Sequence, residues 1–579
     1  MCNIMCNTTT FTLPRGVETF YVISGSLAHI QRFIYDTTSK GALKNLRGRS
    51  FYLTLLTRAI CDRLLRELNI THDALLYNSG GTFCIIAPYV DGVKERLADV
   101  IKEVRKSVSQ MVGDDIVNIC TIKAKRTELD DQCVKVFERL FKMKHRSKYN
   151  QYGGEDDHSV IFEPRSQCGN RSYDGICASL RDAEAILVSP AELLNLSGSV
   201  TCEDMGCLGS YFYFGKVNEL SEVTTSGAYL LLINDAPAPQ RCVLPTYREF
   251  IAGSGTKANS FEELFDGEES SHTQLAVMRM DVDNLGILLR SAMARKGTAL
   301  QDYAAFSHKL DSYFKGQVDA LWKQKYAEST VIIYAGGDDL FIVGEWEQML
   351  EFMGEIRQGF KKEFKNNASM SVSAGVVFTA VKFPIIRAAE LGGDEEGRAK
   401  GFEFCGKEKN AISIFETPLR WDCEYNWVME YKDKLVGLVN GGYIERAFIQ
   451  YILQLNENIT FVDGKITPIK YVWQSAYDIS RMAERRSKKG DNDAGVSFMK
   501  SCVADVMSGK TLRGNGVVTP YHTLQLIIIA ARLAEMTLWK NNDKKINHYE
   551  QLSEKRQTKW SRWWPVVWST KRPGWWQQR

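Results

Sequence analysis

The stretch that decides the fold is Leu275–Asn284, which reads LAVMRMDVDN and carries an apolar, strand-like run into Asp281. A helix-like stretch, Phe306–Lys323, follows it. A second apolar run, Val331–Tyr334, then leads into Gly336–Asp339, which reads GGDD, and a third apolar run comes next. Two short strands joined through a Gly-Gly turn predict a hairpin, because glycine tolerates the positive φ angles of such turns. We therefore expect strand, helix and hairpin in this order.

The first part of the chain repeats this pattern. Its strand-like runs, helix-like stretch and glycine turn are Phe20–Ile23, Phe51–Leu68, Ala74–Tyr77, Ser79–Gly81 and Phe83–Ala87. Val22 precedes Gly80 by 58 residues. In the second part, Asp281 precedes Gly336 by 55 residues. Each half therefore predicts the split β-α-β-β-α-β arrangement of ferredoxin-like folds.

Outside these two halves the pattern changes. Short strands, turns and cysteines occupy the segment between them, and after about residue 416 the chain turns helical. We expect an α+β protein in which ferredoxin-like domains at 1–155 and 263–416 flank a small cysteine-containing middle domain at 156–262. A C-terminal helical domain at 417–545 and a tail at 546–579, rich in tryptophan and basic residues, complete the expected organisation.

The composition is that of an ordinary globular protein, with 44% hydrophobic and 25% charged residues. A net charge of +3 does not by itself require a nucleic-acid or membrane partner. No run of about 18 apolar residues is present to span a bilayer, and the first 20 residues show no secretory signal. The 14 cysteines are therefore expected to be mostly reduced thiols in a cytoplasmic protein.

Three carboxylates of the second half are the candidate catalytic groups. Asp281 ends a strand, and Asp338 and Asp339 lie on the hairpin that neighbours it in a ferredoxin-like sheet, so the three should converge. Carboxylate oxygens suit Mg²⁺ or Mn²⁺, and two such ions can activate an attacking hydroxyl and neutralise a leaving pyrophosphate. A plain exposed turn is the alternative, because Gly-Gly-Asp-Asp is also good turn chemistry. The strand that ends in Asp281 favours the metal site.

Other residues of both halves are candidates for binding a nucleotide. Glycines at the turn leave room for a triphosphate, and lysines near the end of the second helix can reach its oxygens, although a solvated lysine is an equally good reading. The first half lacks the acids, because Val22 and a Ser-Gly-Gly turn stand in their places, and it should hold an acceptor nucleotide or buttress the active half. The candidates are Gly336, Gly337, Asp283, Asn284, Ser373, Lys400 and Lys409 in the second half and Gly80, Gly81 and Ser50 in the first.

Several segments together resemble one known family. They read LAVMRMDVDNLG at 275–286, YAGGDDLF at 334–341, IQRFIY at 30–35, SKGALK at 39–44, LRGRSFYL at 46–53 and FPIIRAA at 383–389. Further similarity lies in the helical region around 471–485. On these segments the chain, from about residue 18 to about residue 540, resembles the large signature subunit of type III CRISPR effector complexes, and the subtype A form in particular.

The resemblance implies a paired-palm enzyme, in which the two ferredoxin-like domains are a degenerate first palm and an active second palm. Such an enzyme makes cyclic oligoadenylate second messengers from ATP when the guide CRISPR RNA of the complex captures a target RNA. Asp281, Asp338 and Asp339 would then hold the metal ions, and the first palm would help to bind a second ATP. The implied partners are the other effector subunits, guide RNA and target RNA, with no membrane.

Two features depart from the family. Members often begin with a metal-dependent HD nuclease domain, but here the chain starts almost directly in the first palm, and we interpret His72-Asp73 as a surface turn, so DNA cleavage is not expected. The family also carries paired C-x-x-C elements for zinc, whereas the cysteines here are spaced more loosely, and a tetrahedral zinc site and free thiols explain them equally well. The candidate zinc ligands are Cys168, Cys177, Cys202 and Cys207.

Two other functions stay open. A dinucleotide cyclase of the diguanylate type shares the palm and a Gly-Gly-acidic turn, but the duplicated palm and the lack of a sensor domain argue against it. A scaffold without catalysis is the second, and the intact acids of the second half argue against it. The sequence sets neither the ring size of the product nor whether ATP is joined to another acceptor. Six of the twelve tryptophans lie between Trp560 and Trp576, interleaved with basic residues. This composition suits binding of single-stranded nucleic acid, packing on a partner subunit or an unselected extension of the reading frame, and the sequence favours none of the three.

Overall fold

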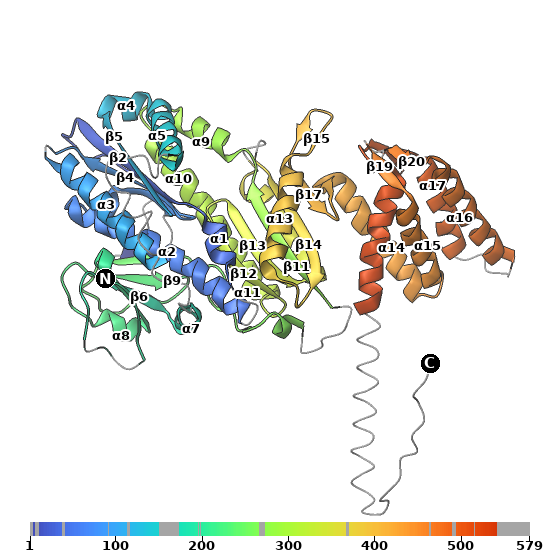
Figure 1. The fold of residues 1–579 in the computed structure, drawn as a ribbon, viewed down its shortest axis with the longest axis horizontal. Helices are drawn as coiled ribbons and strands as arrows, with labels where there is room; N and C mark the ends of the chain where they lie inside the picture. Colours follow the sequence, from blue (N-terminus) through green and yellow to red (C-terminus); the bar gives the residue numbers. More distant parts are fainter. Residues whose placement is uncertain are drawn as a thin grey trace, which may run out of the picture. The chain divides into compact units, whose positions relative to one another are not determined.

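The structure is a computed structural model of the chain (Figure 1). It describes residues 4–5, 11–37, 41–90, 92–112, 116–149, 173–194, 196, 199–265, 273–365, 370–462, 465–488, 494–513 and 516–540. Cys168 and the tail at 546–579 lie outside the described residues. The chain divides into two compact units, with the boundary between Trp421 and Asp422.

The first half folds around a four-stranded antiparallel sheet in the order β3-β4-β2-β5. The strands are β2 (Thr19–Leu27), β3 (Leu75–Ser79), β4 (Thr82–Pro88) and β5 (Val117–Lys125). The helices are α1 (Ile30–Tyr35), α2 (Ala42–Glu67), α3 (Val93–Val112), α4 (Arg126–Asp131) and α5 (Cys133–Tyr149). This strand order is the one expected of a split β-α-β-β-α-β unit. Gly80 and Gly81 join β3 to β4 with φ angles of 58° and 72°, which explains why glycines occupy this turn.

The second half repeats this order and extends it, since its sheet reads β12-β13-β11-β14-β17-β18. The strands are β11 (Gln274–Val282), β12 (Thr330–Gly336), β13 (Asp339–Glu345), β14 (Val372–Ala380), β17 (Ala411–Ile414) and β18 (Thr417–Arg420). The helices are α9 (Leu285–Met293), α10 (Ala299–Asp311), α11 (Val318–Lys325), α12 (Trp346–Glu363) and α13 (Ile385–Lys400), with a π-helical segment, Ser312–Gln317, between α10 and α11. A small hairpin, β15 (Glu403–Phe404) and β16 (Lys407–Glu408), follows α13. The predicted α+β class is confirmed.

The two halves share their hydrophobic core. One cluster contains side chains from both sheets and from α2, each no more than 1% exposed: Ile23, Phe83, Leu56, Val277 and Phe341. On the other face of the first sheet, Leu300 and Tyr303 of α10 join the cluster around Val22. Val22 and Ile23 are neighbours in β2, so their side chains point to opposite faces of the first sheet. Residues of the second half pack in the clusters on both faces. This packing fixes the two halves against each other.

A third sheet has the order β1-β10-β9-β6-β8-β7, and all its strands except the N-terminal β1 come from the segment between the halves. Its strands are β1 (Ile4–Met5), β6 (Ala185–Ser189), β7 (Thr201–Met205), β8 (Ser210–Gly215), β9 (Tyr229–Ile233) and β10 (Thr246–Glu249). Helices α7 (Asp174–Asp182) and α8 (Val217–Ser221) accompany it. Glu249, at the end of β10, forms a partly buried ion pair with Arg58 of α2, which ties this sheet to the first half.

The second compact unit is helical. Its helices are α14 (Asn426–Asn440), α15 (Arg446–Asn458), α16 (Lys470–Lys488), α17 (Ala494–Met507) and a helix over 523–540. Two short hairpins connect them, β19 (Thr460–Val462) with β20 (Lys465–Thr467) and β21 (Thr511–Leu512) with β22 (Val517–Val518). Arg446 of α15 holds Glu535 of the last helix at 2.7 Å. Within the described ranges, every helix is too short or too polar to cross a membrane.

Candidate metal and nucleotide site

Strand pairing brings the two acidic motifs of the second half together. β11 and β13 are antiparallel neighbours, and their register places Asp281 opposite Asp339. The turn from β12 to β13 contains only two residues, of which Gly337 has a φ angle of 58° that side chains rarely adopt. Because the turn is so short, Asp339 starts β13 at the same end of the sheet at which Asp281 is the last residue but one of β11.

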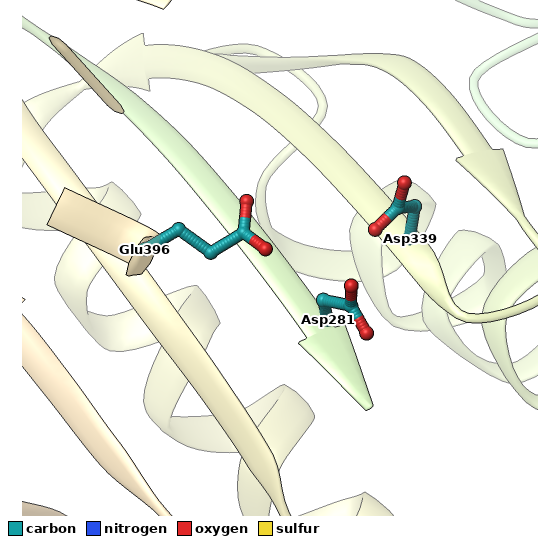
Figure 2. Close-up of side chains that lie close together, drawn as sticks. All are labelled: Asp281, Asp339 and Glu396. Atoms are coloured by element: carbon teal, nitrogen blue, oxygen red, sulfur yellow. The ribbon is translucent and has the colours of Figure 1, made fainter. Parts of the chain in front are cut away.

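A third carboxylate, Glu396 of α13, joins this pair, although it stands in none of the sequence motifs that predicted the site. One oxygen atom each of Asp281, Asp339 and Glu396 lies within 4.8 Å of the others, and Figure 2 shows the three carboxylates side by side. The helix lies close to the sheet because Gly375 of β14 has no side chain. A Cβ atom at that position would lie 2.1 Å from the backbone nitrogen of Glu396.

Two cations surround the three carboxylates. Arg279 holds Glu396 through an Nε–Oε2 distance of 3.0 Å. Lys400 Nζ lies 2.9 Å from Glu396 Oε1 and also forms an ion pair with Asp281. The lysine that the sequence suggested for binding phosphate is therefore a counter-ion of the acidic group in this structure.

Three aspartates of this acidic cluster have raised pKa values. Burial, followed by repulsion from Asp339, raises the pKa of Asp281 to about 7. Burial and the charge of Asp281 raise the pKa of Asp338 to about 6, and burial and the charge of Asp338 raise the pKa of Asp339 to about 6. Buried carboxylates this close favour the protonated form unless a cation compensates them. The four acidic side chains, Asp281, Asp338, Asp339 and Glu396, outnumber their two basic partners, and oxygen ligands with such an excess of negative charge fit a hard divalent cation such as Mg²⁺ or Mn²⁺.

Asp338 differs from the two other predicted metal ligands. It occupies the turn itself, where its carbonyl accepts a hydrogen bond from the backbone nitrogen of Val282 at 3.3 Å. Its side chain is not one of the three whose oxygens lie within 4.8 Å of one another, and the residue lines a neighbouring cavity. The structure thus brings together Asp281 and Asp339 with Glu396, and sets Asp338 beside them.

A cavity of about 660 Å³ opens next to the acidic turn. This volume falls within the roughly 300–1,000 Å³ of small-molecule sites. Its walls come from both halves of the chain, and six of the predicted site residues line it: Ser50, Gly80, Gly81, Gly336, Asp338 and Asp339. The two glycine turns touch, since a Cβ atom on Gly336 would lie 3.1 Å from the Cα atom of Gly80.

Four other predicted nucleotide-binding residues form hydrogen bonds within the protein: Asp283, Asn284, Ser373 and Lys409. Asp283 is 1% exposed and accepts hydrogen bonds from Ser373, from Ser371 and from the backbone nitrogen of Asn410. Lys409 Nζ donates to Asn284 Oδ1 at 2.6 Å. Asp283 and Ser373 therefore fasten the ends of β11 and β14 from inside the protein, a different role from the contact with nucleotide that we predicted.

The predicted zinc site is not assembled by its described members. Cys177 is buried on α7, where Arg47 donates to its sulfur at 3.4 Å, while Cys202 and Cys207 are exposed near β7. Among the described residues these three cysteines form no group of three ligand atoms within reach of one ion. Cys177 faces the protein core and Arg47 instead, so the described cysteines favour the free-thiol alternative.

The dipeptide His72-Asp73 lies at the surface, as expected, with Asp73 exposed. It lies in a short 3₁₀ helix, His72–Ala74, and His72 Nε2 is 2.8 Å from Oδ1 of the buried Asp62. Tyr229 of the third sheet donates to the other oxygen of Asp62 at 2.7 Å. Asp62, which His72 also contacts, thus joins the first half to the third sheet.

Two protein families match parts of the chain. The second palm domain of Cas10/Cmr2 matches residues 274–413, and domain B of the Csm1 subunit matches residues 19–167. The chain is also 25% identical over 488 residues to the CRISPR system single-strand-specific deoxyribonuclease Cas10/Csm1 (subtype III-A) of Methanocaldococcus jannaschii, which covers 71% of this chain. Its homologues are Cas10/Csm1 large subunits of subtype III-A. The family predicted from the motifs is therefore confirmed.

A second Cas10/Csm1 relative of the same name, from Streptococcus thermophilus, is 26% identical over 459 residues, or 72% of this chain. The chain spans 60% and 56% of the lengths of these two relatives. Crystal structures of Csm1-Csm4 cassettes share the fold. The cassette in complex with cA4 has a TM-score of 0.61 at 19% identity and covers 90% of this chain and 70% of its own. The cassette with one ATP has a TM-score of 0.60 at 20% identity and covers 89% and 70%.

Proposed function

We propose that this chain is a nucleotidyltransferase that converts ATP into cyclic oligoadenylate, as the large subunit of a type III-A CRISPR effector complex that is activated by target RNA. One observation carries the proposal. Asp281, Asp339 and Glu396 gather their oxygens within 4.8 Å at the edge of a cavity that is large enough for a small-molecule ligand. Divalent cations bound there would lower the pKa of an attacking hydroxyl group and neutralise a leaving pyrophosphate.

The residues of the chain have distinct tasks in this reaction. Asp281, Asp339 and Glu396 would hold the metal ions, with Asp338 beside them. Gly336 and Gly80 have no side chains to block a triphosphate, and their contact makes the first half a wall of the same cavity. Phosphoryl-type transfer depends mainly on positioning and on neutralising charge. A cavity with one wall from each half suits two nucleotides that must meet in line.

The solved Csm1-Csm4 cassettes support adenine over guanine nucleotides. Their names record complexes with cA4, pppApA, AMPPNP and ATP. By analogy we propose ATP as the substrate, Mg²⁺ or Mn²⁺ as the cofactor, and a Csm4-like subunit, guide RNA and target RNA as partners. The curated relatives are also named single-strand-specific deoxyribonucleases. That this chain does not cut DNA stays a prediction, which incubation with labelled single-stranded DNA and Mn²⁺ will check.

The test of the proposed function is product analysis of the assembled complex. The complex is incubated with target RNA, Mn²⁺ and either ATP or GTP, and the products are identified by mass spectrometry. Cyclic oligoadenylate from ATP is expected, and Asp281→Asn should abolish it without preventing assembly. A product from GTP alone would favour the diguanylate type of cyclase. No product from either nucleotide, with the complex and its RNA intact, would favour the scaffold.

A further inference from the structure

The helix that runs through the second half changes its winding beside the cavity. Between α10 and α11 the segment Ser312–Gln317 is π-helical, a rare geometry that is frequent at functional sites. It carries Lys315, which lines the cavity although the residue is only 7% exposed. Lysine is rarely buried without a partner, so its neighbours are informative.

Lys315 belongs to a row of alternating charges at the cavity wall. Its Nζ atom lies 2.9 Å from Asp311 Oδ1 and 4.0 Å from Glu249 Oε1. Glu249 in turn pairs with Arg58, and both of these side chains also line the cavity. The row therefore connects α10 of the second half with β10 of the third sheet and α2 of the first half.

The row ends on the glycine turn of the first half. Ser79, the last residue of β3, donates its hydroxyl hydrogen bond to Asp311 Oδ1, the same oxygen that Lys315 contacts. The next residue is Gly80, which touches Gly336 of the acidic turn. A Cβ atom on Gly337 would also lie 3.7 Å from Ser79 Oγ. A carboxylate of the second half thus holds the first half's turn against the acidic turn.

We infer that Asp311 and Lys315 are positioning residues that fix the Ser79–Gly81 turn against Gly336, and that they thereby set where a nucleotide on the first half meets the acids. The inference deepens the proposed function and rests on it. Stability alone is a weak explanation for the row, because buried ion pairs can often be replaced by apolar residues with little loss of stability. A role in placing one turn against another explains why charge is retained at this wall.

The test uses the full chain in its complex and measures kcat, the KM for ATP and the Mn²⁺ affinity. Ser79→Ala, Asp311→Asn and the double variant are compared with wild type. Each should lower kcat by about 10- to 100-fold, the scale expected for a misplacement of about 1 Å, with unchanged Mn²⁺ affinity. The double variant should be no worse than the more affected single variant, because both changes break one connection. Lys325→Met, which removes an exposed ion pair with Glu355, is the control and should leave kcat unchanged.

Hydrogen exchange of the hairpin 75–88 gives a readout that does not depend on activity. Its amides should exchange faster in Ser79→Ala and in Asp311→Asn than in wild type or in Lys325→Met. Multiplied effects in the double variant, an unchanged kcat, or unchanged exchange of the hairpin would each overturn the inference. If the wild-type complex makes no product from ATP, the proposed function fails, and the exchange of the hairpin alone decides whether the row positions the turn.

Discussion

Replacing Asp339 with asparagine should make the folded chain more stable in the absence of divalent cations. The pKa of Asp339 is raised from 3.8 to about 6, first by burial and then by the charge of Asp338. A carboxyl group whose pKa is higher in the folded state lowers stability above its unfolded pKa. The penalty is small near pH 4, grows as the pH rises through about 6 and is fully present at about pH 8. At 1.36 kcal/mol per pKa unit, removal of the charge should add about 2 to 3 kcal/mol at about pH 8.

Divalent cations should reverse this difference. A ligand at about 100 times its Kd stabilises the folded state by about 2.7 kcal/mol, provided that it does not bind the unfolded chain. The wild type should gain this amount from Mn²⁺. Asp339→Asn replaces one carboxylate ligand with an amide, so Mn²⁺ should stabilise this variant far less. The variant should therefore no longer be more stable than the wild type when Mn²⁺ is present.

The assay is urea unfolding of wild type and variant at about pH 4.5 and about pH 8, each with EDTA or with Mn²⁺. Asp283→Asn is the matched control, because it changes a neighbouring aspartate whose oxygens accept hydrogen bonds from Ser371, Ser373 and the backbone of Asn410. This control should lose about 1–3 kcal/mol in EDTA and in Mn²⁺ alike. The reasoning is refuted if Asp339→Asn is less stable than wild type at about pH 8 in EDTA.

Three further outcomes are expected. Glu396→Gln should lower product formation about 10- to 100-fold because it alters one of the grouped carboxylates. Glu390→Gln, on the exposed side of the same helix, should match wild type. Equal losses of product in the two variants would contradict the assignment of Glu396. Lys400→Met should strengthen Mn²⁺ binding and weaken ATP binding in calorimetric titrations, because a cation beside Asp281 repels metal ions and attracts phosphate. Weaker binding of both Mn²⁺ and ATP would contradict this role of Lys400. The Mn²⁺ affinity, followed by electron paramagnetic resonance, should fall about tenfold per pH unit below about pH 7, where the raised pKa of Asp281 lets protons compete, and a pH-independent affinity would point to another site.

The pairing of Asp281 with Asp339 could be predicted because it depends on local rules. A strand, a hairpin and a two-residue glycine turn leave little freedom in register, and register decides which side chains face each other. Glu396 could not be found in this way. Its place depends on how closely α13 crosses the sheet, which the missing side chain of Gly375 permits. A glycine inside an apolar strand is the one signal for such a close approach.

The buried residues of the predicted site show the opposite limit. Asp283 and Ser373 stand in motifs that also carry the candidate catalytic acids, and a motif does not say which of its polar groups face the cavity and which satisfy one another inside the protein. Burial decides this, and burial depends on segments about 90 and 127 residues away, where Ser373 and Asn410 lie. The same holds for Cys177, whose buried contact with Arg47 joins residues 130 positions apart. Spacing along the chain carried no information about either contact.

The contact between the two glycine turns has a consequence for the direction of synthesis. The turns are counterparts in two similar sheets, yet one carries two aspartates and the other carries only serine, glycine and threonine. Two nucleotides that meet across this seam would therefore not be interchangeable. Under the proposed function, one nucleotide would face the charged edge and the other the edge without acids, so a growing oligomer would present the same terminus to the acids at every addition.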